Sequence, residues 1–119
     1  ATSRADWLLY NEEERDKYLN DPHIPAQITA SLMYELLSGM INCVSKKAKT
    51  ASLAPVYILS GSDDAVSEYG KNIKTTVNLM TKQGFNIKDI MIFNNMRHDI
   101  LHEKDNIKVL DYIYEAITH

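Results

Sequence analysis

The chain has 119 residues, of which 45% are hydrophobic and 24% charged, an ordinary balance for one globular domain that excludes a disordered or collagen-like chain. The formal net charge is −3, and no basic stripe is present, so we expect no nucleic-acid partner. The apolar runs are too short for a transmembrane segment, no signal peptide is expected, and the single cysteine, Cys43, favours a reducing, cytoplasmic compartment.

The first half of the chain predicts two helices with a proline-containing stretch between them. Residues 11–20 predict a short helix capped by Asn11, because acidic residues fill its first turn, where the helix dipole favours them. Pro22 and Pro25 end this helix. Residues 29–49 predict a longer helix with one wide apolar face at spacings of three and four, made of Ile28, Leu32, Met33, Leu36, Leu37, Met40, Ile41, Val44 and Ala48.

The second half predicts a βαβ unit followed by a final helix. Two unbroken apolar runs, 56–59 and 90–93, predict parallel strands that are buried on both faces. A helix over about 67–83 joins them, with Gly84 just past its end, and the last helix begins at about Asp105. The inward faces of these helices are predicted to be Tyr69, Ile73, Val77 and Met80, then Ile107, Leu110, Ile113, Tyr114 and Ile117.

The number of predicted strands is too small for a stable sheet. Strands that are apolar on both faces belong in the centre of a larger sheet, and two strands alone are marginal in water. We therefore expect the missing sheet partners to come either from a longer parent polypeptide or from another copy of this chain. The second possibility is a homo-oligomer that forms through unpaired strand edges.

Polar clusters follow both predicted strands. The first strand leads into Gly61-Ser62-Asp63-Asp64, and the second into residues 94–99, which include a histidine. Ligands bind beyond the carboxyl ends of parallel strands, so an acid and His98 are expected to face each other across one groove. A carboxylate that accepts the imidazole N–H fixes the tautomer and leaves the other ring nitrogen as a general base. No G-x-S-x-G elbow supplies a nucleophile within the chain.

Three short motifs carry a family resemblance. Residues 55–118 resemble the C-terminal end of an α/β-hydrolase, most closely the lysophospholipase and monoacylglycerol-lipase-like group, also called the serine aminopeptidase group. The family pattern G-x-x-D, Y-G-K and R-H-[ED]-x-L-x-E corresponds here to Gly61-Ser62-Asp63-Asp64, Tyr69-Gly70-Lys71 and Arg97-His98-Asp99-Ile100-Leu101-His102-Glu103. The first half is similar more weakly, through Asp6-Trp7-Leu8 and Asn20-Asp21-Pro22.

The resemblance implies a fold class and a catalytic arrangement. It implies an α/β fold that is the C-terminal fragment of an α/β-hydrolase, with the end of a cap region over residues 1–28 and core domain over 29–119. It makes Asp64 the triad acid and His98 the triad base, with the nucleophilic serine on a missing N-terminal part upstream of Ala1. The implied substrate is a small carboxylic ester, of lysophospholipid or monoacylglycerol type, with no cofactor and no metal. The fragment alone is then expected to be inactive.

Departures from the family pattern and other interpretations remain at this stage. The family often has proline and glycine where this chain has Ala65 and Ser67, and glycine where it has Asn95, although asparagine also tolerates a left-handed turn. Asp64 is also interpretable as an ordinary turn residue, with Asp63 as the competing acid. Two different classes of protein stay open: a receiver-like or flavodoxin-like module with five parallel strands, and a metal-dependent hydrolase that uses His98, His102 and Asp63.

Overall fold

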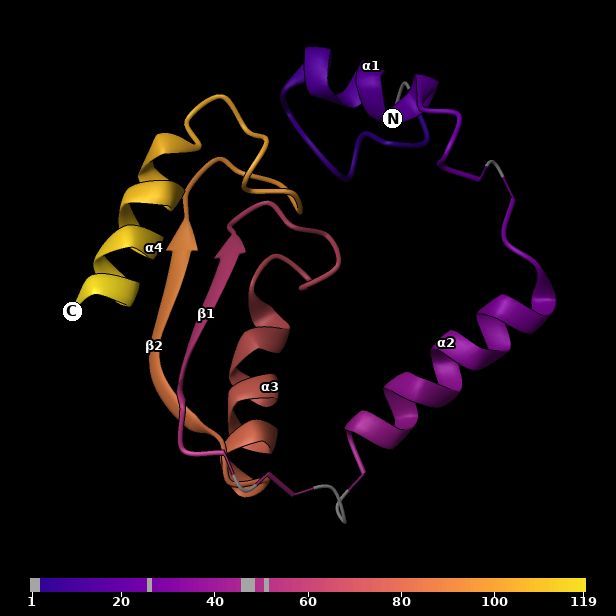
Figure 1. Cartoon of the computed structure of the whole chain (residues 1–119). Helices are drawn as coiled ribbons and strands as arrows, with labels where there is room; N and C mark the ends of the chain where they lie inside the picture. The colour runs from indigo at the N-terminus through magenta and orange to yellow at the C-terminus, as the bar shows by residue number, and fades with distance from the viewer. Residues whose placement is uncertain (1–2, 26, 46–48, 51) are drawn as a thin grey trace.

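The structure is a computed structural model that describes residues 3–25, 27–45, 49–50 and 52–119. Its elements, in chain order, are α1 (Glu12–Asn20), α2 (Ala30–Cys43), β1 (Pro55–Gly61), α3 (Lys71–Lys82), β2 (Asn86–Phe93) and α4 (Ile107–Thr118). Both strands point toward the end of the molecule where the N-terminal segment and α1 lie (Figure 1). The α/β class and the predicted order of helices and strands are therefore confirmed.

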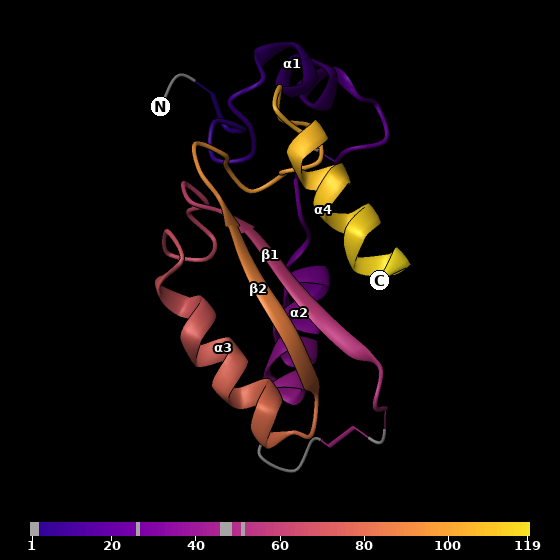
Figure 2. The same ribbon diagram turned by 90° about the vertical axis from the view of Figure 1, so that its left-hand side faces the viewer.

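The sheet formed by the described residues has two parallel strands. The register runs from Pro55 opposite Asn86 to Gly61 opposite Phe93, with a shift by one residue after Val56. Helices α3 and α4 lie on opposite sides of the strands (Figures 1 and 2). The predicted βαβ unit is thus present, and its two strands end at the same edge.

A small apolar core lies beneath the carboxyl ends of the strands. Phe93, Met96 and Val109 are its buried members, and Val109 has no solvent exposure. The ring of Tyr112 meets that of Phe93 edge-on at 6.0 Å between centroids. The core therefore fixes α4 against the end of β2, directly below the loop that follows this strand. Partly buried residues complete it: Leu59, Ile100, Tyr112 and Ile113.

Two predicted helix boundaries are wrong: the start of α3 and the end of α2. Helix α3 begins at Lys71, because Glu68, Tyr69 and Gly70 have φ values of 50°, 57° and 85°, which a right-handed helix cannot include. Tyr69 accordingly lies outside the helix face predicted for it. Helix α2 ends at Cys43 rather than at residue 49, and residues 46–48 of the prediction lie outside the described residues.

Much of the predicted buried surface is exposed. No residue of α2 is buried, so its wide apolar face is open, and Cys43 is exposed as well. The prediction that both strands are buried on both faces is wrong. In β1 the run 56–59 is only half-buried, and in β2 the side chains of Ile90, Met91 and Ile92 are between 36% and 40% exposed. The inward face predicted for α4 is also wrong except at Ile113, since the following residues are exposed: Ile107, Leu110, Tyr114 and Ile117. The physical reason is that two strands offer too little sheet to cover these faces.

None of the described helices has the length and apolar character that a membrane crossing requires; the longest, α2, has 14 residues.

The pairing of Tyr112 with Asp89 links α4 to β2 and gives a prediction for titration. The Tyr112 hydroxyl donates a 2.5 Å hydrogen bond to Asp89, which raises the pKa of Tyr112 to about 12 and lowers the pKa of Asp89. The stabilisation from Tyr112 is present below pH 10 and is lost as the pH rises toward 12. We expect Asp89→Asn to return the pKa of Tyr112 toward 10.0, measured by phenolate absorbance with Tyr112→Phe as the reference. Superimposable titrations of the parent and Asp89→Asn would contradict the assignment.

Candidate active site

The loops that follow the two strands stay hydrogen-bonded to each other beyond the sheet. The backbone N–H of Ser62 donates to Phe93 O at 2.8 Å, and that of Asp63 donates to Met96 O at 2.9 Å. The Asn95 N–H donates to the hydroxyl of Ser62, also at 2.9 Å. The parallel pairing therefore continues into the two polar clusters and brings them to one edge, as the sequence predicts.

Gly61 is required by the closeness of this approach. A Cβ atom at residue 61 would lie 2.2 Å from Met96 O and 2.3 Å from Arg97 O, distances that real Cβ atoms do not show. Asn95 turns the second loop with a φ of 58°, the left-handed conformation that the sequence predicts for an asparagine at this position. Gly61 thus allows the close contact between the loops, and Asn95 allows the left-handed turn of the second loop.

Asp64 and His98 meet at the edge formed by the two loops. Asp64 Oδ2 lies 3.0 Å from His98 Nδ1, and Asp64 is only 6% exposed. The other carboxylate oxygen, Oδ1, accepts the backbone N–H of Val66 at 2.8 Å. Because an ionised carboxylate only accepts hydrogen bonds, His98 carries its proton on Nδ1, and Nε2 is left with a free lone pair. The His98 side chain is 41% exposed, and among the described residues its ring has Asp64 as its one hydrogen-bond partner.

The structure distinguishes the two neighbouring aspartates. Asp63 points away from His98, and its two oxygens accept the hydroxyl of Tyr10 at 2.7 Å and that of Ser62 at 2.9 Å. Asp64 serves the turn through Oδ1 and the histidine through Oδ2, so its turn role and its pairing use different atoms. Of the two candidate acids, Asp64 is the one that meets the imidazole.

The described residues lack the geometry that a metal-dependent hydrolase or a receiver-like module requires. His102 pairs with Asp99 at 2.8 Å and not with His98, and the described residues contain no group of three side chains that could hold a metal ion. A receiver-like module requires five parallel strands, whereas the described residues form two.

No nucleophile faces His98 among the described side chains. The hydroxyl of Ser60, near the end of β1, donates to Gly61 O at 3.3 Å. In the loop that follows, the hydroxyl of Ser62 donates to Asp63 and that of Ser67 donates to Asp64 O at 3.0 Å, so all three are engaged elsewhere. Cys43 lies at the end of α2, and Figure 1 shows that end near the opposite end of the strands. The site therefore contains an acid and a base without the atom that they would activate.

The cavities near this edge have mixed polar and apolar linings. A cavity of about 370 Å³ beside the two loops is lined by aromatic, acidic and basic side chains: Asp6, Trp7, Tyr10, Asp63, Ala65, Tyr69 and Arg97. An apolar cavity of about 430 Å³ lies between the end of α2 and α3, at the other end of the strands. The described residues thus provide no apolar cavity next to His98.

The N-terminal segment, residues 3–11, contacts these loops; the resemblance implied the end of a cap over residues 1–28, but the sequence did not indicate which side chains of this segment make the contacts. The indole of Trp7 lies 5.2 Å from the imidazole of His98, between ring centroids, and the Arg97 guanidinium lies 3.9 Å above the ring of Tyr10. Glu103, which is 5% exposed, accepts the N–H of Tyr10 at 2.6 Å. Arg97 and Glu103 both belong to the motif around His98, and their charges were the available signal that this loop binds another segment.

Comparisons with known proteins give a family and a fold. The family model described as "Serine aminopeptidase, S33" matches residues 1–105. The crystal structure of a highly thermostable carboxyl esterase from Bacillus coagulans in complex with glycerol is similar, with a TM-score of 0.74 and 19% sequence identity. The match covers 98% of this chain and 38% of the esterase chain, so this chain spans well under half of that protein's length. At this identity the likeness shows the fold alone. None of the curated proteins matches the chain.

A substitution at Gly61 tests the close approach of the two loops. We expect Gly61→Ala, in the complete protein, to lower the free energy of unfolding by about 1–3 kcal/mol, the usual cost of overpacking, because the new methyl group meets two backbone oxygens. The matched control is Gly39→Ala in α2, where a Cβ meets nothing within 4 Å and removal of a helical glycine stabilises by about 0.5–1 kcal/mol. Urea denaturation measures both, and equal effects of the two substitutions would contradict the steric account.

Proposed function

The chain belongs to the serine aminopeptidase S33 family of the α/β-hydrolase superfamily, and we propose that it is the C-terminal part of a serine hydrolase that cleaves carboxylic esters. The single observation that carries the proposal is the 3.0 Å pairing of Asp64 with His98 at the carboxyl edge of two parallel strands. We assign Asp64 as the acid and His98 as the base of the triad. Residues 1–28 are then the end of a cap region, and residues 29–119 the C-terminal part of the core domain.

The geometry supports general-base chemistry at His98 Nε2. Asp64 accepts a hydrogen bond from Nδ1–H, so it holds the neutral tautomer whose Nε2 lone pair is free. When Nε2 takes a proton, the buried carboxylate stabilises the resulting imidazolium. The exposed side of the His98 ring leaves Nε2 accessible to a group from outside the described residues.

The reaction that we propose has two halves. A serine hydroxyl gives its proton to His98 Nε2 while its oxygen attacks the ester carbonyl, and the protonated Nε2 then gives that proton to the departing alcohol. In the second half, water gives a proton to Nε2 and its oxygen attacks the acyl-serine. The same proton returns to the serine oxygen as the carboxylic acid leaves, so His98 ends in its starting state.

The nucleophile and the acyl pocket are proposed to lie in the N-terminal part of the parent protein. Support comes from Ser60, Ser62 and Ser67, whose hydroxyls are engaged away from His98, and from the mixed polar and apolar lining of the nearby cavity. An acyl chain needs an apolar cavity, and the apolar one described here lies at the other end of the strands. The exposed apolar faces of α2 and β2 are in turn the surfaces on which the missing part would pack.

The substrate class is proposed to be a glycerol ester, of lysophospholipid or monoacylglycerol type. The motifs around Asp64 and His98 support it, because they are the motifs of that hydrolase group. The similar Bacillus coagulans carboxyl esterase is described in complex with glycerol, the alcohol that cleavage of a monoacylglycerol releases. A purified protein that hydrolyses aminoacyl anilides but no glycerol ester would favour peptide cleavage and contradict this choice.

A serine-directed fluorophosphonate probe tests where the nucleophile is. We expect the probe to label the complete protein and to leave the 119-residue chain unlabelled, since acyl transfer needs the serine. Gel fluorescence after incubation measures the label, with heat-denatured protein as the background. Labelling of the isolated chain at a serine would show that the nucleophile lies within it and would overturn the proposed division.

The two histidine–aspartate pairs of the chain provide a matched test of the base. We expect His98→Gln to reduce ester hydrolysis by the complete protein by about 10³-fold or more, and Asp64→Asn by about 10⁴-fold through the wrong tautomer. His102→Gln removes a histidine whose Nδ1 lies 2.8 Å from Asp99, and it should keep kcat within about twofold of the parent. Loss of activity in His102→Gln, with His98→Gln still active, would transfer the role of base to His102.

A further inference from the structure

We propose that the N-terminal segment (residues 3–11) is a positioning element for His98, acting through Trp7 on the imidazole and through Tyr10 on the residues that precede Asp64 and His98. The inference rests on the proposed function, since it assigns a role in the reaction of that site. It goes beyond the dyad itself, because no residue of this segment takes part in the pairing of Asp64 with His98.

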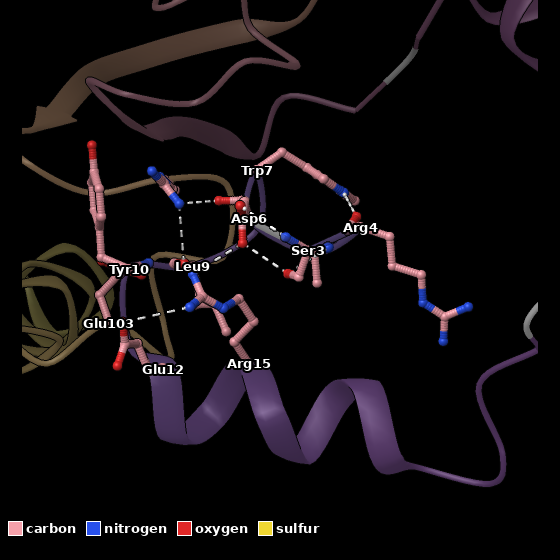
Figure 3. Close-up of polar contacts among 11 residues, drawn as sticks. Ser3, Arg4, Asp6, Trp7, Leu9, Tyr10, Glu12, Arg15 and Glu103 are labelled. Atoms are coloured by element: carbon pink, nitrogen blue, oxygen red, sulfur yellow. Dashed lines mark hydrogen bonds and ion pairs between the residues drawn. The ribbon is translucent and has the colours of Figure 1, made fainter. Parts of the chain in front are cut away.

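The segment is firmly held before it reaches the site. Ala5, Leu8 and Leu9 are three of the six buried apolar residues in the described part of the chain. The Asp6 carboxylate accepts hydrogen bonds from the Ser3 hydroxyl at 2.7 Å and the Ser3 N–H at 3.1 Å, and it lies 3.3 Å from Arg15 of α1 (Figure 3). A segment anchored by both burial and charge can act as a rigid support.

The residues on either side of His98 both bind backbone oxygens of this segment. Arg97 Nη1 donates to Asp6 O, and the backbone N–H of Asp99 donates to Leu8 O at 2.9 Å. The backbone of His98 is therefore fixed from both neighbours by one piece of chain that is about ninety residues away in sequence.

Tyr10 connects the same segment to both loops. Its hydroxyl donates to Asp63, the residue before Asp64, and its ring lies under the guanidinium of Arg97, the residue before His98. Its backbone N–H donates to the buried Glu103. One tyrosine thus contacts the neighbour of each member of the dyad, which fixes the distance between the two loops.

Trp7 acts on the imidazole directly. Its ring is tilted by 45° to that of His98 at 5.2 Å, and its Nε1 donates to Arg4 O at 3.1 Å, which orients the indole (Figure 3). The imidazole is exposed, and the described residues give it one hydrogen bond, so Asp64 alone leaves it free to rotate about that bond. The indole restricts this motion and keeps Nε2 aimed at one place, which is the geometric requirement for a general base.

The experiment uses the complete protein with ¹⁵N-labelled histidine and follows the Nδ1 proton of His98, assigned by its loss in His98→Gln. We expect Trp7→Leu to broaden this resonance and to lower kcat for ester hydrolysis about threefold to tenfold, with KM within twofold. Trp7→Phe keeps an aromatic ring and should restore both. Tyr114→Leu, the same kind of change at an exposed residue of α4, should leave both unchanged.

A second variant keeps the proposal testable if Trp7→Leu fails to fold. Tyr10→Phe removes only the hydroxyl that binds Asp63, and we expect several-fold faster exchange of the His98 Nδ1 proton with water. The proposal is overturned if Trp7→Leu or Tyr10→Phe leaves this proton and kcat as in the parent, or if Tyr114→Leu has the same effect. If the complete protein cleaves no ester, the proposed function fails while the resonance still decides whether the segment positions His98.

Discussion

The meeting of two backbone loops at Gly61 is the constraint on which the rest of the site depends. The carbonyl oxygens of Met96 and Arg97 occupy the space that a side chain at residue 61 would take. Because Asp64 lies three residues after this glycine and His98 one residue after Arg97, the contact also sets the distance between acid and base. The absence of a side chain at residue 61 therefore allows the two loops to approach, and this approach brings Asp64 and His98 together.

Within the described residues, the edge that carries Asp64 and His98 is better packed than the faces of α2 and β2. The buried apolar residues lie in the N-terminal segment and in the core under β2, next to the two loops. The faces of α2 and of β2, by contrast, are open, although apolar surface of this extent is normally covered. Since the chain matches 38% of the length of a similar esterase, coverage by the rest of a larger hydrolase is our proposal for these faces, and pairing of two copies through their strand edges is the other proposal.

Sequence patterns predicted the order of elements and the meeting of an acid with His98. They did not predict the start of α3 or the contact of Trp7 with His98, and each of these has a physical reason. Parallel strands bring their carboxyl ends to one edge, so two apolar runs predicted that an acid would lie near His98, and the family resemblance identified that acid as Asp64. The start of α3 did not follow, because left-handed backbone at Glu68 and Tyr69 leaves no periodic signal. The contact of Trp7 with His98 could not be predicted either, since nothing in the local sequence reports a partner 91 residues away.

The described residues contain two histidine–aspartate pairs with similar N–O distances, and their differences bear on the catalytic role that we propose for one of them. His102 and Asp99 are three residues apart, so the pair forms locally, with side chains that are 57% and 30% exposed. Such a pair forms wherever a turn allows it, and water competes for both groups. The pair of His98 and Asp64 joins two loops, and the side chain of Asp64 is 9% exposed. The backbone next to His98 is held by the N-terminal segment. A pair suited to repeated proton transfer therefore needs a buried acid and a restrained base in addition to the hydrogen bond. The exposed pair of His102 and Asp99 has the hydrogen bond without the buried acid.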